Sequence, residues 1–102
     1  MTIELDPKYA AAYYNRGLSY YALRQHGRAI QDFDKAIELD PKDAKAYYNK
    51  ACAYALMGDP AKACDWLSQA IDLDPKCREM AVTDTDFDFT RNAQCFRELT
   101  GE

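Results

Sequence analysis

The string Leu-Asp-Pro-Lys occurs three times along this chain, and both intervals are 34 residues. The copies stand at residues 5–8, 39–42 and 73–76. When residues 5–42 are aligned with residues 39–76, 17 of the 38 compared positions are identical. A fixed period of this size predicts stacked supersecondary units, each of which buries its apolar face only against a neighbour.

Each unit is predicted to contain two helices. In the first unit, the earlier helix carries apolar residues at near-helical spacings, namely Tyr9, Tyr13, Leu18, Tyr20 and Leu23. The later helix carries a wider apolar stripe, made of Ala29, Ile30, Phe33, Ala36, Ile37 and Leu39. Asp40-Pro41 then separates the two units, and Asp59-Pro60 after Gly58 gives the second unit its inner boundary. The fold class is therefore expected to be all-α.

The pattern of the two units resembles the tetratricopeptide repeat (TPR), an antiparallel helix pair of 34 residues. The matching residues are Tyr13, Gly17, Tyr20, Ala29, Phe33, Ala36 and Pro41, and then Tyr47, Ala51, Tyr54, Ala63, Leu67, Ala70 and Pro75. The resemblance implies a right-handed solenoid of helix pairs, with repeats at residues 10–43 and 44–77. One departure is the turn of the first repeat, where glycine is expected at Arg24 and appears at Gly27 instead. An irregular turn containing His26 is therefore predicted.

The two ends of the chain differ from a complete repeat. Residues 1–9 match only the last turn of a preceding repeat, or a linker, and predict an uncovered face on the first helix. Residues 78–102 resemble an incomplete third unit with a C-terminal capping helix. We expect a short helix over residues 76–83, a turn through residue 89 and a final helix over residues 91–99. Phe87, Phe96 and Leu99 are predicted to cover the second repeat, with Arg91, Asn92, Gln94, Arg97 and Glu98 facing water.

Three alternating aspartates, Asp84, Asp86 and Asp88, begin like a calcium-binding loop. Such a loop needs glycine directly after the third acidic position and glutamate at the twelfth, where this chain has Phe89 and Cys95. We therefore predict no metal site, and expect the aspartates to hold the turn and cap the final helix. The four cysteines include no close pair, and only one histidine accompanies them, so zinc is not expected. Free thiols in a reducing compartment are the first interpretation, and disulfides remain open if the protein is exported.

Composition excludes several functional classes. The net charge is −4 without a basic cluster, which does not favour nucleic-acid binding. The chain contains no apolar run long enough to span a membrane and no signal-peptide pattern at its start. Phosphate-binding and nucleophile motifs are absent, so neither catalysis nor a cofactor is predicted.

The expected function is therefore non-catalytic binding of a protein or peptide partner in the cytoplasm. The resemblance to tetratricopeptide repeats places a concave groove along the first helix of each repeat. Its predicted residues are Ala11, Tyr14, Asn15, Leu18 and Tyr21, followed by Lys45, Tyr48, Asn49, Cys52 and Ala55. Tyrosine and asparagine side chains in this arrangement suit an extended peptide or a helix. One alternative is homo-oligomerisation through the open N-terminal face, and another is a metal- or redox-responsive role of the cysteines or the aspartate run.

Overall fold

The computed structural model describes residues 9–88 and 90–101, and in this part of the chain every regular element is helical. The elements are α1 (Ala10–Ala22), α2 (His26–Leu39), α3 (Ala44–Leu56), α4 (Pro60–Leu73), α5 (Lys76–Thr83), the short 3-10 helix η1 (Thr85–Phe87) and α6 (Gln94–Thr100). The half-repeat expected before Tyr9 lies outside the described residues. No helix of the described part is both long and apolar enough to cross a membrane.

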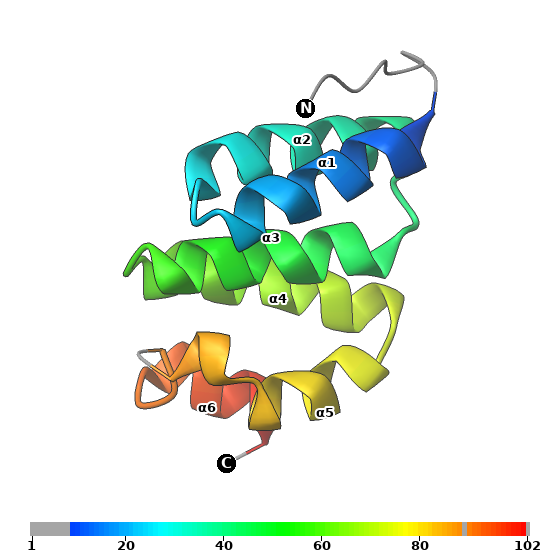
Figure 1. Cartoon of the computed structure of the whole chain (residues 1–102). Helices are drawn as coiled ribbons and strands as arrows, with labels where there is room; N and C mark the ends of the chain where they lie inside the picture. Colours follow the sequence, from blue (N-terminus) through cyan, green and yellow to red (C-terminus); the bar gives the residue numbers. More distant parts are fainter. Residues whose placement is uncertain (1–8, 89, 102) are drawn as a thin grey trace.

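The helices stack as successive antiparallel pairs, as Figure 1 shows. Helices α1 and α2 form the first pair, α3 and α4 form the second, and α5 with η1 and α6 closes the far end. Helix α3 lies between α2 and its own partner α4, and η1 packs against α3. The predicted helical solenoid is confirmed, and the helix over residues 76–83 has the predicted bounds.

The second repeat shows most clearly why the chain folds locally in this way. Gly58 adopts a φ of 78°, a left-handed conformation that ends α3 at little cost. The side chain of Asp59 then accepts a hydrogen bond from the Lys62 amide, and Pro60 occupies the first turn of α4. The end of one helix and the start of the next are thus specified by adjacent residues.

The core runs along the stack and consists of small residues facing large ones. Phe33, Leu67, Phe87 and Phe96 are completely buried, and alanines of the facing helices allow close approach. Phe87 and Phe96 cover the second repeat as predicted, and Leu99 packs against the same cluster. Burial of each aromatic side chain contributes on the order of 2–3 kcal/mol.

The predicted irregular turn in the first repeat is wrong. Arg24 adopts a φ of 61°, close to that of Gly58 at the same position of the second repeat. The hydrogen bonds also correspond, since the Gln25 amide donates to Tyr20 and the Asp59 amide donates to Tyr54. Packing of the helix pair imposes one turn geometry on both repeats, although arginine adopts it less readily than glycine. His26 is consequently the first residue of α2, not part of a loop.

The C-terminal segment also differs in detail from its prediction. The final helix begins at Gln94 after Ala93, and within the described residues no side chain caps it, so the expected aspartate cap is wrong. Arg91 is half-buried and does not simply face water. Its guanidinium donates to the carbonyls of Val82 (2.5 Å) and Asp84 (3.1 Å), which fastens the turn to the end of α5.

The expectation of four free thiols is corrected for two cysteines. Cys64 on α4 and Cys95 on α6 form a disulfide with a Cα–Cα distance of 6.1 Å. Sequence spacing gave no sign of this pair, because only the return of α6 onto α4 brings the two positions together. Among the described residues, Cys52 and Cys77 are free and buried.

Candidate binding groove

The ten residues predicted to face the groove fall into an open set and a covered set. Ala11, Asn15 and Lys45 are exposed, and Tyr14, Leu18, Tyr21 and Asn49 are half-buried. Tyr48, Cys52 and Ala55 are buried, with at most 5% of each residue exposed. The groove is therefore not a uniform surface, because one part of it is already occupied by the chain itself.

The open part is a hollow between α1, α3 and α5 with a volume of about 270 Å³. Four predicted residues contribute to its wall, namely Tyr14, Lys45, Tyr48 and Asn49. The Asn49 Nδ2 group donates to Tyr14 Oη (2.9 Å) and to the Lys45 carbonyl (2.9 Å). The first bond joins α3 to α1, and the second lies within α3. Together they fix the Asn49 side chain in one orientation.

Sequence reasoning missed the other half of this wall. Ala44, Asp74, Cys77 and Met80 complete it, and Met80 is 48% exposed although it is a large apolar residue. A signal was available, because α5 is the first helix of the third unit and first helices line the groove. Its apolar residues at positions 77 and 80 are three residues apart, which places them on one helical face.

The covered part of the groove holds the acidic turn, which we define as residues 84–87. Tyr48 Oη donates to Asp84 Oδ2 at 2.7 Å, and Tyr21 Oη donates to Asp86. The Cys52 thiol lies 3.8 Å from the same Asp84 oxygen. Asp84 also accepts from the Asp86 amide at 2.9 Å, so this carboxylate both shapes the turn and binds it to α3.

Aromatic packing also anchors the acidic turn on α3 and α6. The rings of Tyr48 and Phe87 meet edge to face with centroids 5.8 Å apart, and Phe87 contacts Phe96 of α6 at 5.3 Å. Such pairs contribute about 0.5–1.5 kcal/mol beyond the burial of their area. The turn, α3 and α6 are thereby joined into one packed unit.

The hydrogen-bond donors of the covered part are held in their neutral forms. Burial, with the nearby Cys52 and Asp84, raises the pKa of the Tyr48 hydroxyl far above its ordinary value. Burial, followed by the hydrogen bond to Asp86, has the same effect on the pKa of Tyr21. The Cys52 pKa is also raised, first by burial and then by Asp84 and Asp86, which disfavours the thiolate form that nucleophilic attack requires.

Cys52, Asp84 and Asp86 bring three metal-ligand atoms within 4.8 Å of one another. The two carboxylates accept hydrogen bonds from Tyr48 and Tyr21. To bind a metal ion, the Cys52 thiol would have to lose its proton, which the raised pKa of this thiol opposes. Asp88 points elsewhere, toward Arg91 at 3.3 Å. The three alternating aspartates therefore do not converge as a calcium loop requires.

A second hollow, of about 340 Å³, lies on the other side of the acidic turn. Its wall combines Arg24, His26 and Asp86 with Tyr21, Leu56 and Thr85. None of the exposed large apolar side chains of the described residues lines this hollow, and Asn49 does not contribute to it. We therefore regard the hollow beside Met80 as the better candidate site.

Comparisons with known proteins agree with this architecture. A family model described as tetratricopeptide repeat matches residues 10–43, and a second model with the same description matches residues 33–65. The solved crystal structure of MamA is similar with a TM-score of 0.77 and 25% sequence identity, covering 95% of this chain and 55% of that one. The chain thus spans about half the length of the MamA chain, and no curated protein matches its sequence. Together the two model matches extend over more than half of the chain, which belongs to the tetratricopeptide repeat family.

Proposed function

We propose that this chain binds a peptide or a helix of a partner protein in the hollow between α1, α3 and α5. Tetratricopeptide repeats serve generally as scaffolds for protein interaction, which supports a binding role without catalysis. The observation that favours this hollow is Met80, a large apolar side chain left 48% exposed beside ordered polar groups. Exposed apolar area with a polar rim is typical of recognition surfaces.

The chemistry of the hollow indicates what it accepts. A volume of about 270 Å³ suits one or two apolar side chains of a peptide, and it is below the usual size of a cofactor site. Both bonds of Asn49 use Nδ2, so among the described residues its Oδ1 remains available to accept a peptide N–H. Lys45 at the exposed rim provides a cation for a carboxylate of the peptide.

Tyr48 is a poor position at which to test this proposal. Tyr48 is one of the predicted groove residues, but its ring packs on Phe87 and its hydroxyl donates to Asp84. Its removal would disturb the acidic turn as well as the groove. Asn49 and Met80 are better positions for substitution, because the first is half-buried and the second is exposed.

The test begins with peptides selected from a random phage-displayed library against the wild-type protein. Their affinities are then measured by fluorescence polarisation for Met80→Glu and Asn49→Ala. We expect at least about a tenfold loss for Met80→Glu, because a carboxylate in the hollow opposes entry of an apolar side chain. Met57→Glu is the matched control, since Met57 is similarly exposed, at 53%, and does not line the hollow. Equal affinities for both glutamate variants would contradict the proposal.

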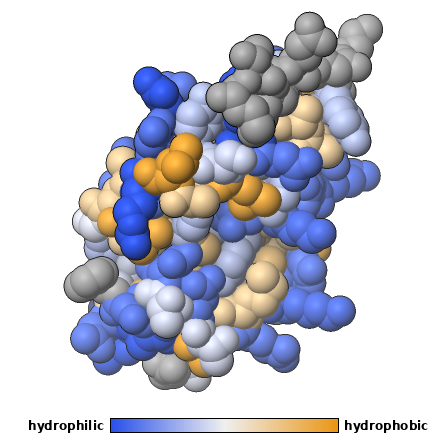
Figure 2. Space-filling view, viewed as in Figure 1, coloured by the Kyte–Doolittle hydropathy of each residue, from blue (hydrophilic) through white to orange (hydrophobic). Residues whose placement is uncertain are grey.

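Self-assembly is a second candidate function, favoured by the outer face of α1. Tyr9 and Leu23 are 59% and 66% exposed, and Arg16 lies over the Tyr13 ring. The equivalent positions of Tyr13 and Arg16 in α3 are Tyr47 and Lys50, which are buried. The face seen in Figure 2 shows apolar groups scattered among polar ones.

Light scattering over a concentration series separates the two candidates. A mass that doubles with concentration, and returns to the monomer value in Leu23→Glu, would support association through α1. A monomer at all concentrations would oppose it.

Cytoplasmic location remains a prediction, as do the repeat boundaries at residues 10–43 and 44–77.

A further inference from the structure

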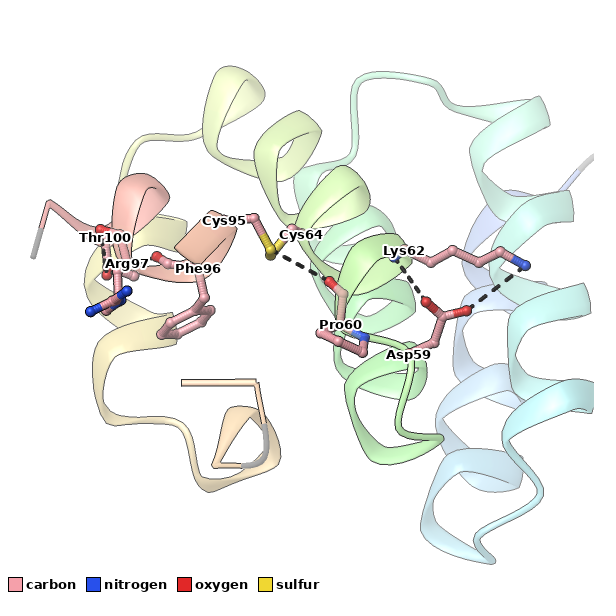
Figure 3. Close-up of a disulfide and its surroundings, with 8 residues drawn as sticks. All are labelled: Asp59, Pro60, Lys62, Cys64, Cys95, Phe96, Arg97 and Thr100. Carbon is pink, nitrogen blue, oxygen red and sulfur yellow. Dashed lines mark hydrogen bonds and ion pairs between the residues drawn. A yellow bond between two sulfur atoms is a disulfide. The ribbon is translucent and has the colours of Figure 1, made fainter. Parts of the chain in front are cut away.

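The disulfide between Cys64 and Cys95 connects two elements whose other contacts are few. It joins α4 to α6 across a sequence separation of 31 residues, and in Figure 3 Cys95 points from α6 toward Cys64 while Phe96 points away from the disulfide. Helix α6 has only seven residues, too few to be stable alone in water. Besides the disulfide, its position depends mainly on buried Phe96 and on the bond from Arg78 Nε to the Leu99 carbonyl (3.0 Å).

A short path of contacts leads from this disulfide to the covered part of the groove. Cys95 is followed by Phe96, whose ring contacts Phe87 at 5.3 Å. Phe87 contacts Tyr48 at 5.8 Å, and Tyr48 donates to Asp84 of the acidic turn. Holding α6 on α4 therefore helps to hold residues 84–87 over Tyr21, Tyr48 and Cys52.

Solution reaches the disulfide from the Cys95 side. Cys64 and Cys95 both line a surface hollow of about 270 Å³ whose wall also includes Asp65, Ser68 and Glu98. Cys95 is half-buried, whereas Cys64 is only 5% exposed and is as buried as the free cysteines Cys52 and Cys77. A thiol reductant in solution therefore meets the disulfide at the Cys95 sulfur.

We propose that the Cys64–Cys95 disulfide is a reducible latch that controls access to the covered part of the groove. Two molecules of a thiol reductant transfer two electrons and two protons to the pair. Cys64 and Cys95 become thiols, and the reductant leaves as its own disulfide. Without the bond, α6 and the acidic turn open more often and expose the side of α3 that carries Tyr48 and Cys52. The effect on partner binding rests on the proposed function, whereas the latch itself does not.

The experiment uses the whole chain in oxidised and reduced form, without any peptide. Peptide mapping by mass spectrometry first identifies the bond between the two cysteines, and its absence from the oxidised protein would overturn the proposal. Amide hydrogen exchange is then compared between the two forms. We expect exchange within residues 84–101 to become roughly tenfold faster or more on reduction, since a cross-link of this loop length restricts opening.

Helix α2 provides the internal control, and its exchange rates should not change, whereas the end of α1 is not a control because Tyr21 donates to Asp86. Cys64→Ser/Cys95→Ser should exchange at the reduced rate under both conditions, and the wild-type comparison decides the matter if this variant does not fold. Equal exchange of residues 84–101 in the oxidised and reduced wild type would overturn the latch. Because this readout needs no peptide, failure of groove binding would leave it unaffected.

Discussion

Helices α3 and α4 begin at side-chain caps that α1 and α2 lack. Asp43 and Asp59 accept hydrogen bonds from the Lys45 and Lys62 amides, each at 3.1 Å. The same positions in the first repeat are Tyr9 and Gln25, and within residues 9–88 and 90–101 neither makes a cap with its side chain. Each cap contributes about 1 kcal/mol, so the second repeat has the more stable helix starts.

The turns and the packing show the same contrast. Gly58 allows the left-handed turn that Arg24 must adopt with a side chain. In the helix pair, Gly17 faces Phe33, whereas the equivalent positions of the second repeat are Ala51 and Leu67. The two repeats thus share one backbone fold but have different residues at the helix starts, at the turn and at the contact between the paired helices. Since neighbouring repeats stabilise one another, the weaker first repeat depends on its contact with α3.

The largest expected effect tests the packing difference. A Cβ atom at Gly17 would lie 2.7 Å from Phe33 Cε1, and Phe33 is completely buried. We expect Gly17→Ala to lower the free energy of unfolding by about 2–3 kcal/mol, measured by urea denaturation. Adding Phe33→Leu, which reproduces the alanine–leucine pair of the second repeat, should recover part of this loss. A double variant no more stable than Gly17→Ala would contradict the pairing.

The next effect concerns the cations at equivalent positions of α1 and α3. Arg16 donates to both oxygens of Asp32, at 2.7 and 2.8 Å, and the Asp32 side chain is only 6% exposed. We expect Arg16→Met to destabilise the fold by about 2 kcal/mol, because the buried carboxylate loses its partner.

Lys50→Met is the matched variant in the second repeat. Lys50 lies 3.3 Å from the centre of the Trp66 ring and pairs with Asp34, whose side chain is 51% exposed. Because Asp34 can remain hydrated, this loss should be smaller, below about 1 kcal/mol. A larger effect at Lys50 than at Arg16 would reverse the comparison.

Removing the cap of α4 and adding a cap to α2 should each change the free energy of unfolding by about 1 kcal/mol, in opposite directions. Asp59→Ala removes the cap of α4 and should lower the midpoint of thermal unfolding. Gln25→Asp introduces the equivalent cap at α2 and should raise that midpoint, as followed by circular dichroism. If Gln25→Asp had no effect, the difference between the helix starts would not account for the stability of the first repeat.

The smallest effect belongs to the turns. Arg24→Gly should stabilise the protein by roughly 0.5–1 kcal/mol, because relief of the left-handed strain exceeds the entropy that glycine adds to the unfolded chain. Gly58→Ala should destabilise it by a similar amount. Chemical denaturation gives the free energy of unfolding of both variants. Changes of the same sign in the two variants would show that the two turns are not equivalent.

The sequence predicted the parts of this molecule that depend on local pattern. The repeat period and the Asp-Pro pairs give the helices, and Phe87 and Phe96 are identifiable as anchors of the C-terminal cap. The conformation of Arg24 was not predictable from its residue type, because packing of the helix pair overrides the preference for glycine. The disulfide and the docking of Asp84 and Asp86 on tyrosines 36 or more residues away depend on the tertiary fold.

The groove illustrates the same limit. Repeat logic assigned Tyr14, Lys45, Tyr48 and Asn49 to the groove, and these four residues line one hollow, but it treated Tyr48 and Cys52 as being as accessible as the others. Their burial results from a segment outside the repeat pattern, the acidic turn. Met80, which completes the open hollow, belongs to α5, and the repeat pattern already indicates that the first helix of the third unit lines the groove.

The most direct test of the central claim, that a partner binds in the open part of the groove, is an NMR titration with a peptide selected against the wild-type protein. We predict that the largest amide shifts cluster at Tyr14, Lys45, Asn49 and Met80, and that the peptide produces no comparable shifts on the outer face of α1. Shifts centred on Tyr13 and Tyr20, with the residues around Met80 unchanged, would contradict the account.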